Sequence, residues 1–300
     1  MKKIMLAAAA ALLLMHSGPA VAEPGQKALD EVILSVERSA LTREARESLL
    51  KKADDAVNAG IPADDVAIII TRGLGRGVDG KVIEGLVDTV LAAKAGNLPV
   101  RPVLDRIEQG LSKGVPPERI FTVTKRLAEK LAGADGIVTS LIMSGLKAGK
   151  STEKEGAVQT VARALERSVS ENVITQTGIK AKKGNHSLSL FDKAVDTLTT
   201  LKENGMTTDQ ASRLVNKAMD NGYSEKDMRN MEREILNDLR AGRRMDEVIK
   251  NMDSMMERSG FDRGSGGTYR EQAPGSGSGT GGSSGMGGGS GTGGDSGWKW

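Results

Sequence analysis

The fold is decided by four short stretches, Gly60-Ile61-Pro62, Gly114-Val115-Pro116, Gly205-Met206-Thr207 and Gly222-Tyr223-Ser224. Each consists of a glycine, a large apolar residue and then Pro, Thr or Ser. Weaker copies lie near Gly77, Gly96, Gly133 and Gly242. Within each half of the chain the turns recur at roughly 17–20 residues, a step that one short helix and one tight turn would fill. The sequence therefore predicts an all-α fold, a short-helix repeat array that is solenoid-like or made of stacked helical hairpins.

The residues around these turns agree with that prediction. Apolar residues recur at helical spacing, as at Val82, Leu86 and Val90. A glycine after the last helical residue adopts the left-handed conformation at low cost and ends the helix. Thr207 with Gln210 fits a capping box, which starts the next helix. Each turn is thus predicted to end one helix and begin another.

The start of the chain, from Met1 to Ala22, has the three parts of an export signal. Lys2 and Lys3 form the charged region, positions 4–15 are apolar, and Ala20-Val21-Ala22 fits a small-x-small cleavage site. We expect a signal peptide at 1–22 that is cleaved, and a protein exported to the periplasm or the extracellular space. No later stretch is long and apolar enough to predict a transmembrane segment.

The composition leaves few means for catalysis. The chain has no cysteine, which excludes disulfides and thiolate metal sites. After removal of the signal, His186 would be the only histidine and the net charge would be +1. Histidine is the commonest catalytic proton carrier, and nucleic-acid binders carry a basic footprint. We therefore expect no enzyme activity, no cofactor, no metal site and no nucleic-acid partner.

Changes in composition divide the chain. Residues 23–175 are predicted to form an N-terminal helical repeat domain, and residues 187–261 a Met-rich C-terminal helical bundle. Between them, residues 176–186 are β-branched, polar and lysine-rich, which indicates a linker with a solvated Lys180–Lys183 run. Residues 262–300 are predicted to be a disordered Gly/Ser-rich tail, because they contain too few apolar residues to offset the entropy of folding.

Two segments resemble phosphate-binding loops. The first ends in Gly149-Lys150-Ser151 and follows the apolar run 137–143, but Ser144 stands where a Walker A loop has its first glycine. The second, Gly75 to Gly80, fits a dinucleotide fingerprint without the strand–helix–strand context. A nucleotide-dependent factor that uses Lys150 and Ser151 is one alternative function.

The C-terminal bundle is rich in methionine, at positions 206, 219, 228, 231, 245, 252, 255 and 256. Thioethers are soft ligands that suit Cu(I), so a soft-metal binder is a second alternative. However, Met228, Met231 and Ile235 are spaced as one helix face. That spacing favours a hydrophobic core.

The chain ends in Trp298-Lys299-Trp300, which contains both of its tryptophans. A pair of tryptophans on a long polar tether suits docking into a groove of a partner. We therefore expect an exported, non-catalytic helical repeat protein that acts as a protein-interaction or structural scaffold. Its expected partner is an unidentified envelope or extracellular protein, and Trp298, Lys299 and Trp300 are the candidate partner-binding residues.

Overall fold

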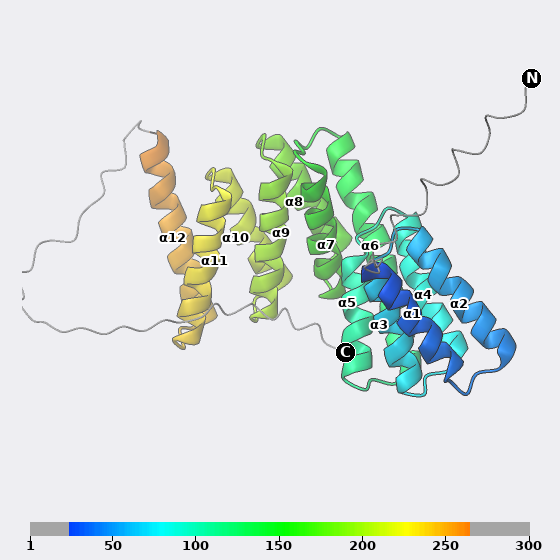
Figure 1. Cartoon of the computed structure of the whole chain (residues 1–300). Coiled ribbons are helices and arrows are strands. Elements are labelled where there is room, and N and C mark those ends of the chain that lie inside the picture. Colours follow the sequence, from blue (N-terminus) through cyan, green and yellow to red (C-terminus); the bar gives the residue numbers. More distant parts are fainter. Residues whose placement is uncertain (1–23, 265–300) are drawn as a thin grey trace, which may run out of the picture. The chain divides into compact units, whose positions relative to one another are not determined.

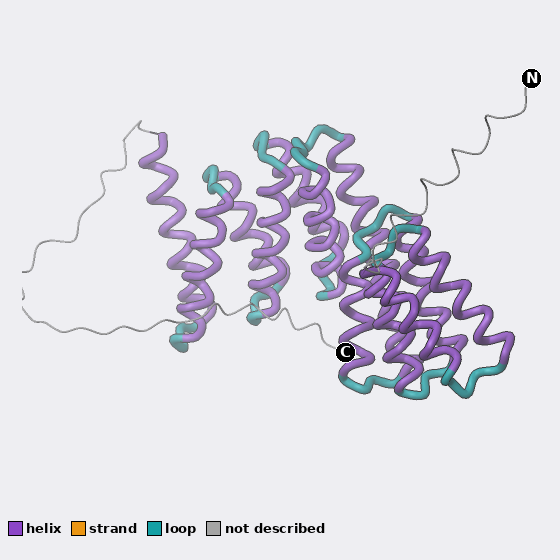
Figure 2. The backbone as a smooth tube through the Cα atoms, in the orientation of Figure 1, coloured by secondary structure: helices purple, strands orange, loops and turns teal. Residues whose placement is uncertain are grey.

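A computed structural model describes residues 24–264, and within that range the chain is all-α and has no strand (Figures 1 and 2). The first six helices are α1 (Pro24–Glu37), α2 (Arg43–Asn58), α3 (Ala63–Gly75), α4 (Gly80–Ala95), α5 (Arg101–Ser112) and α6 (Pro117–Met143). The remaining helices are α7 (Ser151–Glu166), α8 (Glu171–Lys183), α9 (Leu188–Glu203), α10 (Thr208–Asp220), α11 (Glu225–Arg240) and α12 (Met245–Gly264). The all-α prediction is therefore confirmed.

The glycines of the opening motifs end helices as predicted. Gly60 has φ 81° and Gly114 has φ 67°, which lie in the left-handed region. After Gly60, the backbone N–H of Ile61 donates to the carbonyl of Ala56 at 3.1 Å, which satisfies a carbonyl at the helix end. The side chain of Ile61 is then buried. Each turn thus ends a helix and fastens the next segment to the core.

The capping box predicted at Thr207 is also present. The hydroxyl of Thr207 accepts from the backbone N–H of Gln210, and the Gln210 side chain accepts from the backbone N–H of Thr207. Ser224 and Asp227 make the same reciprocal pair at the start of α11. Two otherwise unpaired donors are satisfied at each helix start.

Gly133, at one of the weaker copies of the turn motif, does not end a helix, contrary to the prediction. Gly133 lies inside α6, which continues for 27 residues. The apolar register continues through it, because Leu131, Ala134 and Ile137 are all buried. Burial of that face outweighs the cost of roughly 1 kcal/mol for an exposed helical glycine. The turn falls instead at Gly145, with φ 108°.

In place of the linker predicted at 176–186, the structure has the last two turns of α8 and a short turn. Ile174, Thr177 and Ala181 of α8 are buried. Tertiary packing therefore overrides the weak helix propensity of the β-branched residues. Asn185, at φ 58°, takes the left-handed position after this helix in place of a glycine.

Packing between helices is arranged by second neighbours. In the first half of the chain α1 contacts α3 and α3 contacts α5, while α2 contacts α4 and α4 contacts α6. Consecutive helices also contact each other across the two sets. The odd-numbered and even-numbered helices of this region therefore form two layers with the core between them.

The chain divides into two compact units, and the division falls within α9 between Asp196 and Thr197. In the second unit α10 contacts α12 and α11 contacts α12. Six methionines of the C-terminal region are buried, namely Met206, Met219, Met228, Met231, Met252 and Met256. Their burial supports the role of the methionine stripes as core. The Gly/Ser-rich tail beyond residue 264 lies outside the described residues.

Candidate partner-binding surface

The first helix carries an exposed apolar pair. Ala28, Val32 and Val36 of α1 are buried, whereas the side chains of Ile33 and Leu34 are 41% and 50% exposed. Large aliphatic side chains that remain this exposed on a helix contribute little to the core of the fold. We call Ile33 and Leu34 the α1 surface.

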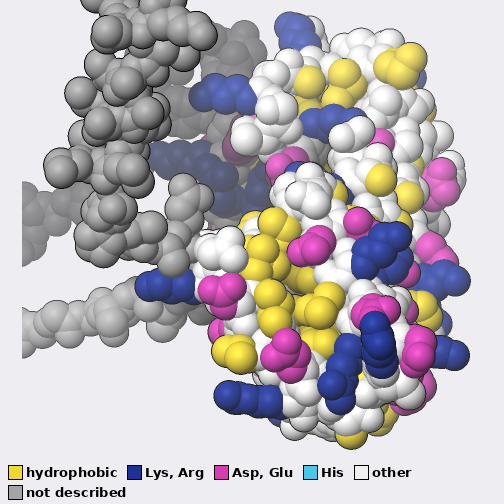
Figure 3. Space-filling model, turned by 45° about the vertical axis from the view of Figure 1, so that its right-hand side comes forward, with side chains coloured by type: hydrophobic (Ala, Val, Ile, Leu, Met, Phe, Trp, Pro, Cys, Tyr) yellow, Lys and Arg dark blue, Asp and Glu magenta, His cyan; other side chains and the backbone are white. Residues whose placement is uncertain are grey.

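Charged residues accompany the α1 surface on the same helix. The acidic side chains of Glu31 and Glu37 are exposed beside it. On the face of the molecule that Figure 3 draws, hydrophobic side chains, in yellow, gather in one area with acidic and basic side chains around it. An apolar centre with a charged rim is the usual composition of a protein–protein contact.

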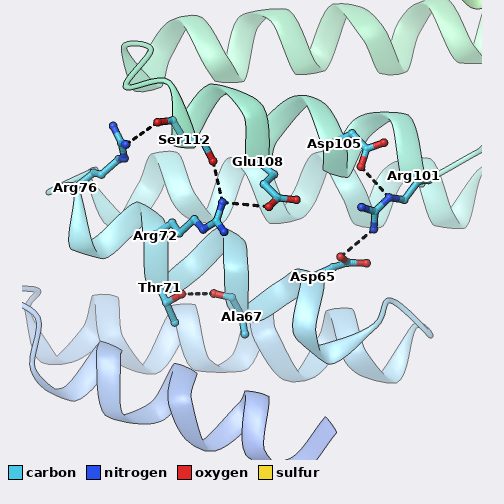
Figure 4. A network of polar contacts seen from close by, with 9 residues as sticks. All are labelled: Asp65, Ala67, Thr71, Arg72, Arg76, Arg101, Asp105, Glu108 and Ser112. Carbon is cyan, nitrogen blue, oxygen red and sulfur yellow. Dashed lines mark hydrogen bonds and ion pairs between the residues drawn. The ribbon is translucent and has the colours of Figure 1, made fainter. Parts of the chain in front are cut away.

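A polar network joins α3 to α5 (Figure 4). The guanidinium of Arg72 donates to Glu108 Oε1 at 3.1 Å and to Ser112 Oγ at 2.8 Å. Arg76 donates to the carbonyl of Ser112 at 2.8 Å. The donors and acceptors of this network satisfy one another across two helices. The network therefore holds α3 and α5 in register.

A second part of the same network lies at the other end of α5. Arg101 bridges Asp65 of α3, at 3.2 Å, and Asp105 of its own helix, at 2.7 Å. These side chains are partly exposed, so each ion pair stabilises the protein by less than about 1 kcal/mol. Together these ion pairs stabilise the contact between α3 and α5 at its partly exposed edge.

A buried ion pair connects α5 to α7, and the sequence analysis missed it. Arg106 Nη2 lies 3.4 Å from Glu166 Oε2, and the two side chains are 3% and 15% exposed. Burial raises the pKa of Glu166 despite the attraction of Arg106 and Arg167. Burial also lowers the pKa of Arg106. The sequence signal was an arginine on the apolar face of a helix, beside Val103 and Ile107.

The Gly149-Lys150-Ser151 segment joins two helices. The apolar run before it is the end of α6, whereas a Walker A loop follows a strand. The backbone N–H of Gly149 donates to Glu153 Oε2 at 3.0 Å, so a carboxylate of α7 occupies a donor that a phosphate would need. The geometry therefore does not support a nucleotide loop at Lys150 and Ser151.

Ser151 does line a pocket of about 480 Å³ between the α4–α5 connection, α6 and α7. An ion pair between Lys154 and Asp135, at 2.8 Å, lies in its wall. The pocket also includes Lys94 and Arg101, and its lining mixes both charges with four apolar residues. A typical small-molecule site is lined mainly by hydrophobic and aromatic side chains, whereas this lining has five charged residues and no aromatic one.

The other sequence-predicted residues lie in two turns or outside the described part of the chain. The Gly75–Gly80 segment is the turn between α3 and α4, with Gly77 at φ 69°. His186 is half-buried in the turn between α8 and α9. Trp298, Lys299 and Trp300 lie outside the described residues. The two candidates within the described residues, Gly75–Gly80 and His186, therefore lie in separate turns.

Between residues 24 and 264, no group of three or more His, Cys, Asp or Glu side chains is placed to hold a metal ion. The helices of that same region include none with the length and hydrophobicity needed to cross a bilayer.

Comparison with protein-family models, with curated proteins and with solved structures gives no match. The residues of the chain alone therefore carry the functional interpretation.

Proposed function

We propose that this chain is an exported, non-catalytic helical repeat protein that serves as a scaffold for a partner protein. The partner would be a protein of the cell envelope or the extracellular space. The observation that carries the proposal is the α1 surface, an exposed apolar pair on a helix of an otherwise well-packed array. Monomeric soluble proteins expose contiguous apolar patches mainly where they bind something.

Regular turn spacing supports the repeat arrangement. In the first half, backbone positions with positive φ include 60, 77, 97 and 114, and the long helix α6 then delays the next one to 145. In the second half they occur at 168, 185, 205, 222 and 242. Positions two turns apart, such as Gly60 and Asn97 or Gly205 and Gly242, are separated by the same interval in both halves. A helical hairpin of about 37 residues repeats at this period.

Ion pairs between second-neighbour helices support the same period. Four such pairs have the same sequence separation of 36 residues, namely Lys52–Asp88, Asp65–Arg101, Arg72–Glu108 and Lys217–Asp253. A constant separation is expected when each hairpin packs on the next in the same way. Repeat proteins of this kind use their extended faces to bind other proteins.

Two features of the sequence outside the described residues complete the proposal. The signal-like residues 1–22 support export. The terminal Trp298-Lys299-Trp300 would add a tethered second contact, because a flexible linker of this length reaches roughly 30–35 Å. A second contact on a tether strengthens binding by raising the effective concentration.

The test is site-specific photocrosslinking in the native cells with the full-length gene. A photoreactive amino acid replaces Leu34 in one strain and Lys51, an exposed residue of α2, in a matched control strain. The proposal expects one envelope protein to crosslink at position 34 and not at position 51. Crosslinking at both positions alike, or at neither, would contradict a specific contact at the α1 surface.

A third strain separates the helices from the tail. It carries the photoreactive group at position 34 and ends the chain at residue 263. A weaker but still specific crosslink would assign the tail an accessory role, and an unchanged crosslink would exclude the Trp-Lys-Trp segment from partner binding.

A further inference from the structure

Two loops that are distant in sequence meet at one end of the first unit. The backbone N–H of Leu188 donates to the carbonyl of Lys147 at 2.7 Å, and Lys147 and Ser187 form an isolated parallel bridge. The α6–α7 loop therefore lies against the α8–α9 loop. Both loops lie at the upper end of these helices in Figure 2.

Four lysines lie in or directly next to these two loops. Lys147 and Lys150 belong to the α6–α7 loop, and Lys182 and Lys183 end α8 directly before the α8–α9 loop. Three of them are exposed and Lys182 is half-buried. Among the described residues, none of these four ammonium groups is in an ion pair with an acidic side chain. The α6–α7 loop does have an acid close by, Glu153, but its carboxylate accepts from the backbone of Gly149.

An exposed apolar side chain lies four residues before Lys147 in the chain. Met143, the last residue of α6, is 83% exposed, whereas Leu141 and Leu146 on either side of it are buried. An unbranched, flexible thioether that extends into solvent adapts readily to an apolar medium. We call Met143, Lys147, Lys150, Lys182 and Lys183 the basic tip.

We propose that the basic tip binds the surface of a membrane that contains anionic phospholipids. The lysines would contact headgroup phosphates, and Met143 would enter the boundary between headgroups and acyl chains. Basic side chains around an exposed apolar residue combine the two attractions of peripheral membrane binding. This inference goes beyond the scaffold role and does not depend on it.

The shape of the basic tip favours a membrane over a free anion. Two of the four lysines belong to the α6–α7 loop and two end α8, and none of them lines the nearby pocket that includes Ser151. A small anion needs converging donors to replace its hydration, whereas a membrane presents many phosphates at once. Several separated lysines therefore match a bilayer better than a single phosphate ion.

Vesicle co-sedimentation tests the charge contribution. The purified protein is mixed with phosphatidylcholine vesicles with and without phosphatidylglycerol, at low and at high salt. Binding is expected only with phosphatidylglycerol and is expected to weaken with salt. Each lysine near an anionic surface contributes roughly fivefold, so Lys147→Gln, Lys150→Gln, Lys182→Gln and Lys183→Gln together should weaken binding by up to roughly 600-fold.

A matched control removes the same number of positive charges elsewhere in the first unit. It combines Lys51→Gln, Lys81→Gln, Lys94→Gln and Lys125→Gln, all at exposed positions. The control variant should retain binding within about fivefold, because distant charges are screened by salt. Equal losses in the two variants, or no dependence on phosphatidylglycerol, would overturn the proposal. Circular dichroism of each variant confirms that it is folded.

A fluorescent probe tests the apolar contribution. Because the chain has no cysteine, Met143→Cys creates a single labelling site, and Ala92→Cys on the exposed surface of α4 provides the control. A polarity-sensitive dye at position 143 should shift to the blue when anionic vesicles are added, and the dye at position 92 should not. Inorganic phosphate in place of vesicles should shift neither dye. A shift with phosphate alone, or the same response at both positions, would refute insertion of the tip.

Discussion

Replacement of Arg106 by methionine should destabilise the first unit in a pH-dependent manner. Methionine keeps most of the apolar volume of the arginine stem but removes the charge that faces Glu166. The Glu166 side chain, which is only 15% exposed, would then lose its strongest attraction. Its carboxyl group would have to remain ionised without that partner or take up a proton on folding.

The free energy needed to protonate Glu166 sets an upper limit on the loss of stability in Arg106→Met. The ordinary pKa of this carboxyl is 4.5, so its protonation at pH 7 costs at most about 3 kcal/mol. Arg167 and Lys130 continue to attract the carboxylate and reduce that cost. In addition, burial already raises the pKa of Glu166 in the unsubstituted protein, so part of the cost is present before the substitution. We therefore expect Arg106→Met to lower the free energy of unfolding by about 2 kcal/mol at pH 7.

The sign of the pH dependence follows from the raised pKa. Below the ordinary pKa of a glutamate, the carboxyl is protonated in both the folded and the unfolded chain and contributes no penalty. As the pH rises through the pKa of the folded state, the unfolded chain releases its proton more readily and stability is lost. The deficit of Arg106→Met should therefore shrink to within about 1 kcal/mol near pH 4.

The assay is urea unfolding followed by far-UV circular dichroism at both pH values. Lys52→Met is the matched control, because it breaks the exposed Lys52–Asp88 pair between two second-neighbour helices. The control should cost less than about 1 kcal/mol at pH 7. An Arg106→Met deficit that is the same at both pH values, or no larger than that of the control, would refute the role given to the buried charge.

Three further substitutions test the packing and the helix ends. Gly178→Ala should lower the free energy of unfolding by about 1–3 kcal/mol, because the new methyl group would overlap the buried side chain of Leu141. Denaturant unfolding measures this loss. A neutral result would mean that α6 and α8 are less closely packed than described. Gly156→Ala in α7 has open space around the new methyl and should instead stabilise by about 0.5–1 kcal/mol, so destabilisation in the same assay would contradict the helix assignment. Thr207→Ala should lower the free energy of unfolding by about 1 kcal/mol and accelerate amide hydrogen exchange at Gln210, because the N–H of Gln210 donates to the Thr207 hydroxyl. Unchanged exchange at Gln210 would argue against the capping box.

The turns are the part of the fold that the sequence predicts best. Gly60, Gly114 and Gly222 each have a positive φ, a conformation that glycine adopts without steric cost. The turns at Ser168 and Asn185 escape prediction because non-glycine residues take the same conformation there. Their identity gives no comparable signal, so the sequence indicates a linker where the structure has the end of α8.

The candidate surfaces are less predictable, because they depend on which helix faces another. Ile33 belongs to the apolar i, i+3, i+4, i+7 pattern that starts at Leu29, so the local pattern does not show that it remains exposed. The basic tip depends on a contact between Lys147 and Ser187, which belong to two different loops with two helices between them. The lysine run at 180–183 is visible in the sequence, but its neighbours across the fold are not.

The second-neighbour packing also affects the order and the speed of folding. The helix contacts described above join elements that are adjacent or two apart in the chain. Each newly formed helix therefore finds its partner among the two helices made just before it. Low contact order of this kind allows rapid folding. A chain that emerges from a channel with its N-terminus first could build its core in the order of emergence, one hairpin after another, without waiting for its C-terminal end.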